Sequence, residues 1–504
     1  MIRLTVAVLL LLIPGLATAQ AETRPTLTVA VQSVHSSLDP AVALANSGFP
    51  LSFNMFDTLI RRDFLSNEEA TGNKFEPGLA ESWEWVDETT LKLTLRDGLT
   101  FHNGEALTSE DVKFTFDRIL DPDSQYVAAR FQLGTIDHVE VVDQRVVTIA
   151  TKQPDAMLID MLAYVGSAIV PKDYFESVGF DGFGQKPVGA GPYRFTALMP
   201  DEEVRLAAFD DYWAGKPPAS ELTFRVMPEV SARITALANG EVDIINSVPP
   251  DQLTAIEGLD CCEVRSVLVN SHVLNYKTAH PVMADKTFRQ ALNLAIDRQL
   301  LSDALWNGEA AVLKGHQYSE WEELYNPQRS DFAYDPDQAR QLLEKSSYDG
   351  EEIVFATHPV YYTNGQAEAQ AVVEMWRKIG VNAKVRVDEN WYGNSKSDPE
   401  IAVRNLSDWL IVADPNATIL WSWSVTALWE GNEAFVTLGE AARSSLDPKV
   451  RFAKYQEMLD LFEEEAPGTV LFRTREYYGV RKAISWQPYT VYMMDFRAPN
   501  LSVE

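Results

Sequence analysis

The chain has 504 residues, 46% of them hydrophobic, and carries a formal net charge of −30 at pH 7. This length exceeds what a single hydrophobic core supports, so we expect two or three domains. The strongly negative charge repels phosphate groups, which excludes nucleic acid as a partner.

The N-terminus has the pattern of a secretory signal peptide. Arg3 precedes an apolar run from Leu4 to Leu12, and Ala17-Thr18-Ala19 supplies the small residues of a cleavage site. The apolar run is too short to anchor the chain in a bilayer. We therefore predict that residues 1–21 are removed and that the mature protein is exported to the periplasm. No Cys follows the small residues, so we expect no lipid anchor.

The segment from Leu95 to Val112 concentrates acidic, His and Asn residues and could be taken for a metal or acid–base site. Thr108 and Asp111, however, have the spacing of a capping box at the start of a helix. His102 has no second His at metal-ligand spacing. We predict that this segment is structural. From Ser82 to Val170 the residues alternate as in β-hairpins, which indicates a smaller inserted domain.

Two strand–helix–strand units, more than a hundred residues apart, predict two separate α/β lobes. Each has a Gly just after its helix, where a left-handed residue is easily accommodated. Their strands and helices are expected at 222–226, 231–238 and 242–245, and at 352–356, 367–379 and 381–387. Between the units, Asp285 is expected to cap a helical run that ends near Asn307-Gly308.

The two cysteines, Cys261 and Cys262, are neighbours in the sequence. Adjacent Cα atoms lie about 3.8 Å apart, below the usual span of a disulfide, so a bond between them would be strained. We expect two small, partly buried thiols rather than a redox site.

Several motifs, in order along the mature chain, resemble those of family 5 of the solute-binding proteins of bacterial ABC importers, the dipeptide-, oligopeptide- and nickel-binding group. The segment from Leu95 to Val112 is one of them. The others are Leu38-Asp39-Pro40, Pro77 to Trp83, Gly189 to Tyr193, Arg233 with Leu237 and Gly240 to Ile244, and Phe288 to Leu292 with Ala295 to Arg298.

The resemblance implies a bilobal α/β periplasmic-binding-protein fold of type II, in its large three-domain variant with a hinge. Domain I would comprise 22–48, 186–277 and 480–504, the inserted domain II 49–185, and domain III 278–479. A small ligand would be enclosed between domains I and III. The closed protein would then dock on an ABC permease with cytoplasmic ATPases. The family implies no cofactor and no oligomer, so we expect a monomer.

In peptide-binding members an Asp shortly after a Trp pairs with the α-amine of the peptide. Trp409 matches that Trp, but Ile411 or Val412 stands where the Asp is expected. A buried ammonium without a carboxylate partner costs several kcal/mol, on the order of the desolvation penalty of an ion. Asp408 or Asp414 could take the place of the missing Asp.

Further candidates lie close by in the sequence. Trp421 and Trp423 would share a face of an extended segment, where they could stack on a ligand; the alternative is that they pack in the core of domain III. Tyr361 could line the cleft or pack in the core in the same way. Arg404 could meet a ligand carboxylate or form a surface salt bridge.

These residues and motifs predict the solute-binding component of an ABC importer, with a peptide as the first expected ligand. An oligosaccharide, an opine-like conjugate or a metal chelate are the alternatives. A secreted hydrolase is the competing class. It would require a Gly-x-Ser-x-Gly elbow, zinc-ligand spacing or an assignable carboxylate pair. The sequence contains neither of the first two, and nothing singles out a pair among its 73 acids, so we expect no enzyme.

Overall fold

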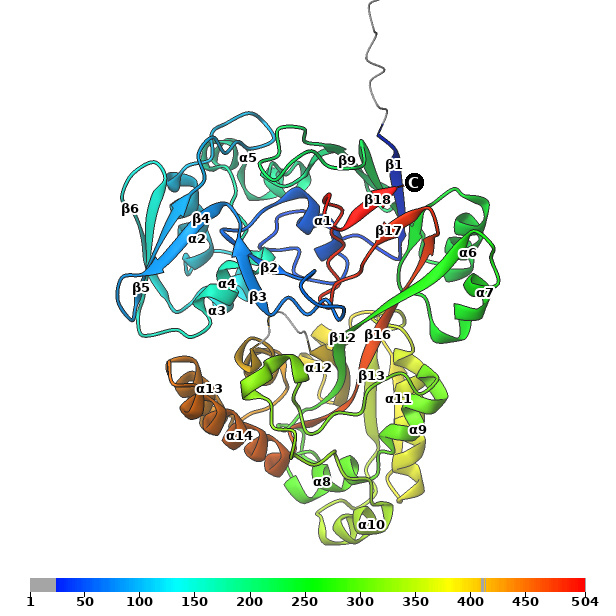
Figure 1. Ribbon diagram of the computed structural model, residues 1–504. Helices are drawn as coiled ribbons and strands as arrows, with labels where there is room; N and C mark the ends of the chain where they lie inside the picture. Colours follow the sequence, from blue (N-terminus) through cyan, green and yellow to red (C-terminus); the bar gives the residue numbers. More distant parts are fainter. Residues whose placement is uncertain (1–23, 409–411, 413, 504) are drawn as a thin grey trace, which may run out of the picture.

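The computed structural model describes residues 24–408, 412 and 414–503, and shows two lobes and a third domain (Figure 1). The first lobe carries β1 and the C-terminal strands, so both ends of the described chain lie in it. The second lobe contains α8 to α14, and the inserted domain contains β4 to β7 and α2 to α5. The predicted bilobal α/β fold is confirmed. The residue boundaries expected for domains I, II and III stay a prediction. The expected signal peptide, residues 1–21, lies outside the described residues.

One ten-stranded sheet runs through both lobes in the order β14-β13-β15-β12-β16-β11-β1-β10-β9-β8. In the first lobe β1 pairs in parallel with β10 and β11, and in the second β13 pairs in parallel with β14 and β15. The strands are β1 (Thr26–Val31), β8 (Tyr193–Met199), β9 (Glu203–Ala208), β10 (Glu221–Val226), β11 (Ile244–Ile245), β12 (Cys262–Tyr276), β13 (Ile353–Thr357), β14 (Ala383–Val387), β15 (Ile401–Asp408) and β16 (Gly468–Arg481).

The two predicted strand–helix–strand units are present. Their helices are α6 (Val230–Asn239) and α11 (Gly365–Lys378). Gly240 and Gly380 follow them with φ of 74° and 105°, the left-handed region that favours glycine.

The helical run expected after Asp285 is divided into two helices, so that prediction was wrong in part. Asp285 does cap α8 (Lys286–Leu294). Asp297 then starts α9 (Arg298–Trp306), because its side chain accepts a hydrogen bond from the Leu300 amide at 2.9 Å.

The inserted domain has a four-stranded antiparallel sheet in the order β4-β5-β7-β6, as the alternating pattern predicted. Alternate residues of β5 (Leu91, Leu93 and Leu95) are fully buried against its helices. The elements are β4 (Ala80–Trp85), β5 (Thr90–Leu95), β6 (Ile136–Val141), β7 (Val146–Thr151), α2 (Ser109–Leu120), α3 (Val127–Leu133), α4 (Leu158–Leu162) and α5 (Lys172–Gln185).

Smaller elements complete the fold. Within the described part of the chain, no helix has the length and apolarity that crossing a membrane requires. The remaining strands are β2 (Ile60–Asp63) with β3 (Lys74–Pro77), and β17 (Ile484–Trp486) with β18 (Leu501–Val503); the remaining α-helices are α1 (Phe49–Met55), α7 (Leu253–Glu257), α10 (Pro336–Lys345), α12 (Trp391–Ser397), α13 (Glu433–Arg443) and α14 (Pro448–Glu465).

The segment from Leu95 to Val112 is structural, as predicted. Asp111 Oδ2 accepts a hydrogen bond from the Thr108 amide at 2.9 Å, which completes the capping box of α2. The His102 ring joins two loops: Nδ1 lies 3.2 Å from the Gly189 amide and Nε2 2.9 Å from the Gly191 carbonyl oxygen. Burial lowers the pKa of His102 to about 4, so the ring is neutral at pH 7.

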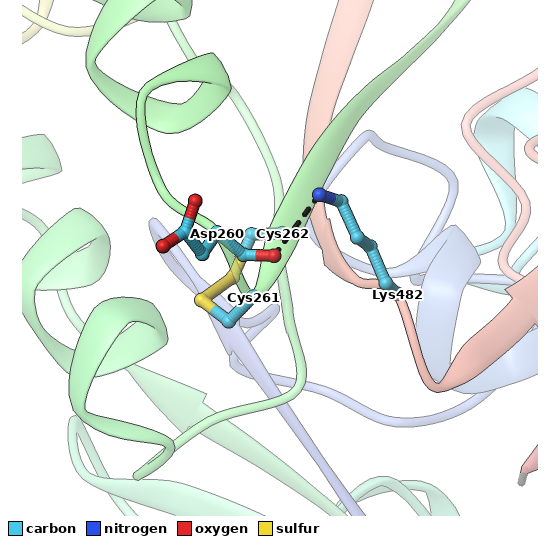
Figure 2. The surroundings of a disulfide bond; sticks show 4 residues. All are labelled: Asp260, Cys261, Cys262 and Lys482. Carbon is cyan, nitrogen blue, oxygen red and sulfur yellow. Dashed lines mark hydrogen bonds between the residues drawn. A yellow bond between two sulfur atoms is a disulfide. The ribbon is translucent and has the colours of Figure 1, made fainter.

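Cys261 and Cys262 form a disulfide, so the expectation of two free thiols was wrong (Figure 2). Their Cα atoms are 3.8 Å apart, as in any pair of adjacent residues. This short Cα–Cα distance does not prevent the disulfide. The pair lies where β12 begins. Lys482, beside it in Figure 2, donates its amide to the Cys261 carbonyl oxygen at 2.9 Å and its Nζ to the Asp260 carbonyl oxygen at 3.0 Å.

Candidate functional site

Two long antiparallel strands, β12 and β16, connect the lobes (Figure 1). Their register shifts near the middle, where Val269 and Asn270 together oppose the single residue Thr474. Such a bulge bends and twists a pair of strands. Arg473 stabilises it by donating its Nε to the Val269 carbonyl oxygen at 2.6 Å. The lobes therefore meet at a bent, two-stranded crossing.

Polar side chains of the first lobe gather next to this crossing. Glu476 of β16 accepts hydrogen bonds from the amide and the hydroxyl of Ser247, at 2.8 Å and 3.0 Å. Burial raises the pKa of Glu476 to about 7, although the hydrogen bonds from Ser247 oppose this. Tyr492 donates a hydrogen bond to the Asn270 side chain. Ser247 and Tyr492 have φ of 51° and 58°, a left-handed conformation that costs about 1–2 kcal/mol in a non-glycine residue.

Tyr361 is the predicted site residue that faces this group from the second lobe. Desolvation raises the pKa of the partly buried Tyr492 phenol, and Tyr361 lies close enough to add to that shift. The Tyr361 hydroxyl lies 2.9 Å from Ser407 Oγ, and its half-buried ring lies 4.8 Å from that of Trp391.

Asp408, His316 and Trp423 form a buried chain of polar contacts. Trp423 Nε1 donates a hydrogen bond to His316 Nδ1 at 3.1 Å, and His316 Nε2 lies 2.7 Å from Asp408 Oδ2. Nδ1 is thus the hydrogen-bond acceptor toward Trp423, and Nε2 faces the Asp408 carboxylate at ion-pair distance without forming a hydrogen bond. Both ionisable side chains are fully buried inside the second lobe, among residues such as Phe462.

Asp414 has structural partners for both of its oxygens. Oδ1 accepts hydrogen bonds from the Asn416 amide at 2.9 Å and from the Tyr455 hydroxyl at 2.8 Å. Oδ2 is paired with Arg451. A ligand amine would therefore have to displace existing contacts in order to bind Asp414.

Arg404 is fully buried, so the expectation of a surface salt bridge was wrong. Its guanidinium donates to Ser395 Oγ at 2.9 Å, to the Tyr392 carbonyl oxygen at 3.2 Å and to the Thr426 carbonyl oxygen. Among the described residues no carboxylate pairs with it. Burial lowers its pKa.

Trp421 and Trp423 do not share a face of an extended segment, and that prediction was wrong. The segment forms two turns of π-helix, Asn416–Leu420 and Ser422–Thr426. Residues two apart in a helix point in different directions. Trp423 therefore enters the core of the second lobe, whereas Trp421, half-buried, reaches the inserted domain and lies 4.8 Å from Phe131, centroid to centroid.

The residues where an amine-binding Asp was expected are only partly described. Trp409 and Ile411 lie outside the described residues. Val412 is fully buried and packs in one hydrophobic cluster with Leu158 and Met161 of α4. An apolar contact between the second lobe and the inserted domain thus replaces a carboxylate at Val412.

The second lobe and the inserted domain are also joined by a buried ion pair. Arg443 Nε and Nη2 lie 3.0 Å and 2.7 Å from the two oxygens of Asp155. The Ala156 amide donates to the Arg443 carbonyl oxygen at 3.0 Å, and Arg443 also donates to the Gln132 carbonyl oxygen at 2.9 Å. Since Arg443 ends α13 and Asp155 precedes α4, these contacts fasten the second lobe to the inserted domain.

Asp160, which the sequence did not single out, lies at the same junction. It belongs to α4, is half-buried, and its pKa is raised to about 7, first by burial and then by the nearby Asp414. No motif marks it, because it is one acid among 73 in the chain. Asp160 differs from the other acids only because the fold places Asp414 of the second lobe near it.

A cavity of about 400 Å³ lies beside the crossing strands, between the two lobes. It is lined by Glu68, by Ser266 and Arg475 of the crossing strands, by Glu320 of the second lobe and by Thr490 of the first. None of the predicted site residues within the described part of the chain lines this cavity.

Residues 74–428 match the model of the bacterial extracellular solute-binding proteins, family 5 (middle part). The chain belongs to this family. It is a solute-binding protein, the component of an ABC importer that captures the ligand, as the motifs predicted. The family is one of binding proteins rather than enzymes.

Similar proteins agree with this assignment. The chain is 27% identical over 489 residues to di/tripeptide-binding protein 1 of Pseudomonas aeruginosa, with 89% of each chain covered. Two solved structures share its fold. The periplasmic binding protein AgaA of A. tumefaciens R10, in complex with agropinic acid, gives a TM-score of 0.83 at 24% identity and covers 95% of this chain and 99% of that one. DppA of Helicobacter pylori, in complex with the peptide STSA, gives a TM-score of 0.84 at 22% identity and covers 95% and 98%.

Proposed function

We propose that the protein is the periplasmic receptor of an importer for short peptides or closely related amino-acid derivatives. It is exported by its signal peptide without a lipid anchor and acts as a monomer. It closes around one ligand and then docks on a membrane permease that is driven by cytoplasmic ATPases. The β12–β16 crossing is its hinge, and the expected domains I, II and III are the bodies that move about it.

The observation that carries this proposal is the closed junction of the lobes around a polar crossing. Polar groups of both lobes meet there. Glu476 lies on β16, Ser247 on the neighbouring loop and Asn270 on β12. Tyr361 comes from the second lobe. A short peptide offers the amide donors and acceptors that such a wall can bind. The di/tripeptide-binding relative, matched over most of both chains, supports the same ligand class.

One observation favours a second candidate ligand, an opine-like conjugate or another sugar derivative. Val412 is apolar and buried, and Asp408 and Asp414 are both engaged inside the second lobe. Trp421, by contrast, is half-buried at the junction, where an aromatic ring could stack on a sugar ring. The fold shared with AgaA is compatible with this alternative.

The deciding experiment is native mass spectrometry of the protein purified from the periplasm of its own host, followed by gentle denaturation to release bound compounds. A ladder of short peptides is the expected result. A single mass of a sugar conjugate would replace the peptide by the second candidate. A substrate that returns chemically altered after incubation would contradict the role as a binding protein.

A further inference from the structure

We propose that the Asp160 carboxylate, on the face of the inserted domain that the second lobe covers, binds a cationic group of the ligand. The inference rests on the proposed function in one respect, because it requires that a ligand be enclosed at this junction. It does not require that the ligand be a peptide.

The position of Asp160 is fixed by the residues beside it in α4. Leu158 and Met161 are fully buried in the hydrophobic cluster that also contains Val412 and Ala417 of the second lobe. Ile159 and Asp160 are only partly buried. The helix thus presents its apolar side to the cluster, while Asp160 stands beside the contact between the lobes with part of its surface still accessible.

The Asp160 carboxylate has no protein partner. No hydrogen bond or ion pair links its side chain to any residue in 24–408, 412 or 414–503. The other acids at this junction are paired, Asp155 with Arg443 and Asp414 with Arg451. A partly buried carboxylate without a protein partner keeps only part of its hydration, so a cation supplied from outside the chain would complete its contacts.

The cations near Asp160 are already engaged. Arg451 is paired with Asp414, and Arg62 donates to the carbonyl oxygens of Thr71 and Gly72 at 2.6 Å and 2.8 Å. Both guanidiniums act on Asp160 from a distance and lower its pKa, whereas burial and Asp414 raise it. The surroundings therefore leave the carboxylate close to half protonated at pH 7 and ready to ionise when a further cation arrives.

The chemistry at this site is a charge-assisted hydrogen bond. A ligand ammonium or guanidinium donates N–H groups to Asp160, whose proton leaves to solvent if it was present. No covalent bond forms or breaks.

The test is isothermal titration calorimetry with the dipeptide Met-Leu and with N-acetyl-Met-Leu, which lacks the charged amine. The proteins are the wild type, Asp160→Asn, and Asp181→Asn as a control that removes an exposed acid of the same domain. Asp160→Asn should weaken Met-Leu binding by about thirtyfold or more, as when one partner of a buried charge pair is removed. It should leave the weak binding of N-acetyl-Met-Leu unchanged, and Asp181→Asn should behave as wild type. Equal binding of Met-Leu by Asp160→Asn and wild type, or an equal loss for both ligands, overturns the inference.

A failure of the peptide assignment is distinguishable. If the wild type does not bind Met-Leu, the wild type and Asp160→Asn are purified from the host periplasm and their released compounds are treated with an amine-reactive label. Compounds that carry a cationic amine and are retained by the wild type but not by Asp160→Asn support the site without peptides. A wild-type ligand that has no cationic group overturns it. Thermal unfolding verifies that Asp160→Asn is folded, and we expect it to be at least as stable as wild type because a partly buried charge is removed.

Discussion

The ion pair between Arg443 and Asp155 should set how easily the lobes open. Both side chains are buried, at 8% and 1% exposure, and they join the second lobe to the inserted domain. Opening returns them to water, so breaking the pair destabilises only the closed form. Arg443→Met keeps the aliphatic packing but leaves the Asp155 carboxylate buried without its cation, which costs about 3–5 kcal/mol. A change of about 3 kcal/mol shifts the ratio of closed to open protein roughly a hundredfold.

The assay is small-angle X-ray scattering of the ligand-free protein together with the affinity for Met-Leu. We expect Arg443→Met to show a larger radius of gyration and a weaker affinity, because only the fraction that can close binds tightly. The double variant Arg443→Met/Asp155→Asn should recover part of the compact radius of gyration and part of the affinity, because no unpaired charge remains buried. Arg145→Met is the matched control: its ion pair with Glu81 is 41% and 44% exposed and should change little. The same radius and affinity in Arg443→Met as in wild type would refute this reasoning.

Three further outcomes are expected. Burial lowers the pKa of His102 from its ordinary value of about 6.5 to about 4. The stability that the neutral ring contributes is therefore full above pH 6.5 and is lost as the pH falls toward 4, a loss of about 3 kcal/mol. Thermal unfolding of His102→Gln, which is already destabilised at pH 7, should depend less on pH over that range than wild type does, and identical pH profiles would contradict this role of His102. Because Asp160 has a pKa of about 7 and the α-amine of Met-Leu loses its charge only at about pH 7.7–8, Met-Leu affinity should rise from pH 5.5 to 7 in wild type and stay nearly flat over that range in Asp160→Asn. Iodoacetamide should label neither Cys261 nor Cys262 in unfolded, unreduced protein and both after reduction; labelling without a reductant would show that the disulfide is absent.

Local patterns in the sequence predicted the parts of the fold that depend on near neighbours. The capping box at Thr108, the glycine stops at Gly240 and Gly380 and the hairpins of the inserted domain each depend on residues a few positions apart. Where two local signals competed, the prediction was wrong. The run after Asp285 was expected to be one helix, but Asp297 ended it by capping a second.

The site residues show the limit of such local reasoning. Trp421 and Trp423 were predicted to lie on an extended segment, whereas they lie on a helix and point apart. Asp408 and Arg404 were selected because they are charged and near the motif, yet both are fully buried in the second lobe. Their position in the sequence could not reveal that His316, more than ninety residues before Asp408, accompanies it.

The sequence by itself therefore determined the family, the α/β lobes and the role in solute binding, because motifs and hydrophobic periodicity are carried by residues close together along the chain. Only the tertiary structure decided which charges are available to a ligand. Asp155 forms an ion pair with Arg443, and Asp414 forms one with Arg451, while Asp160 has no partner among the described residues. Whether a carboxylate is paired depends on which distant residue the fold places within about 3 Å of it, and sequence order does not encode that distance.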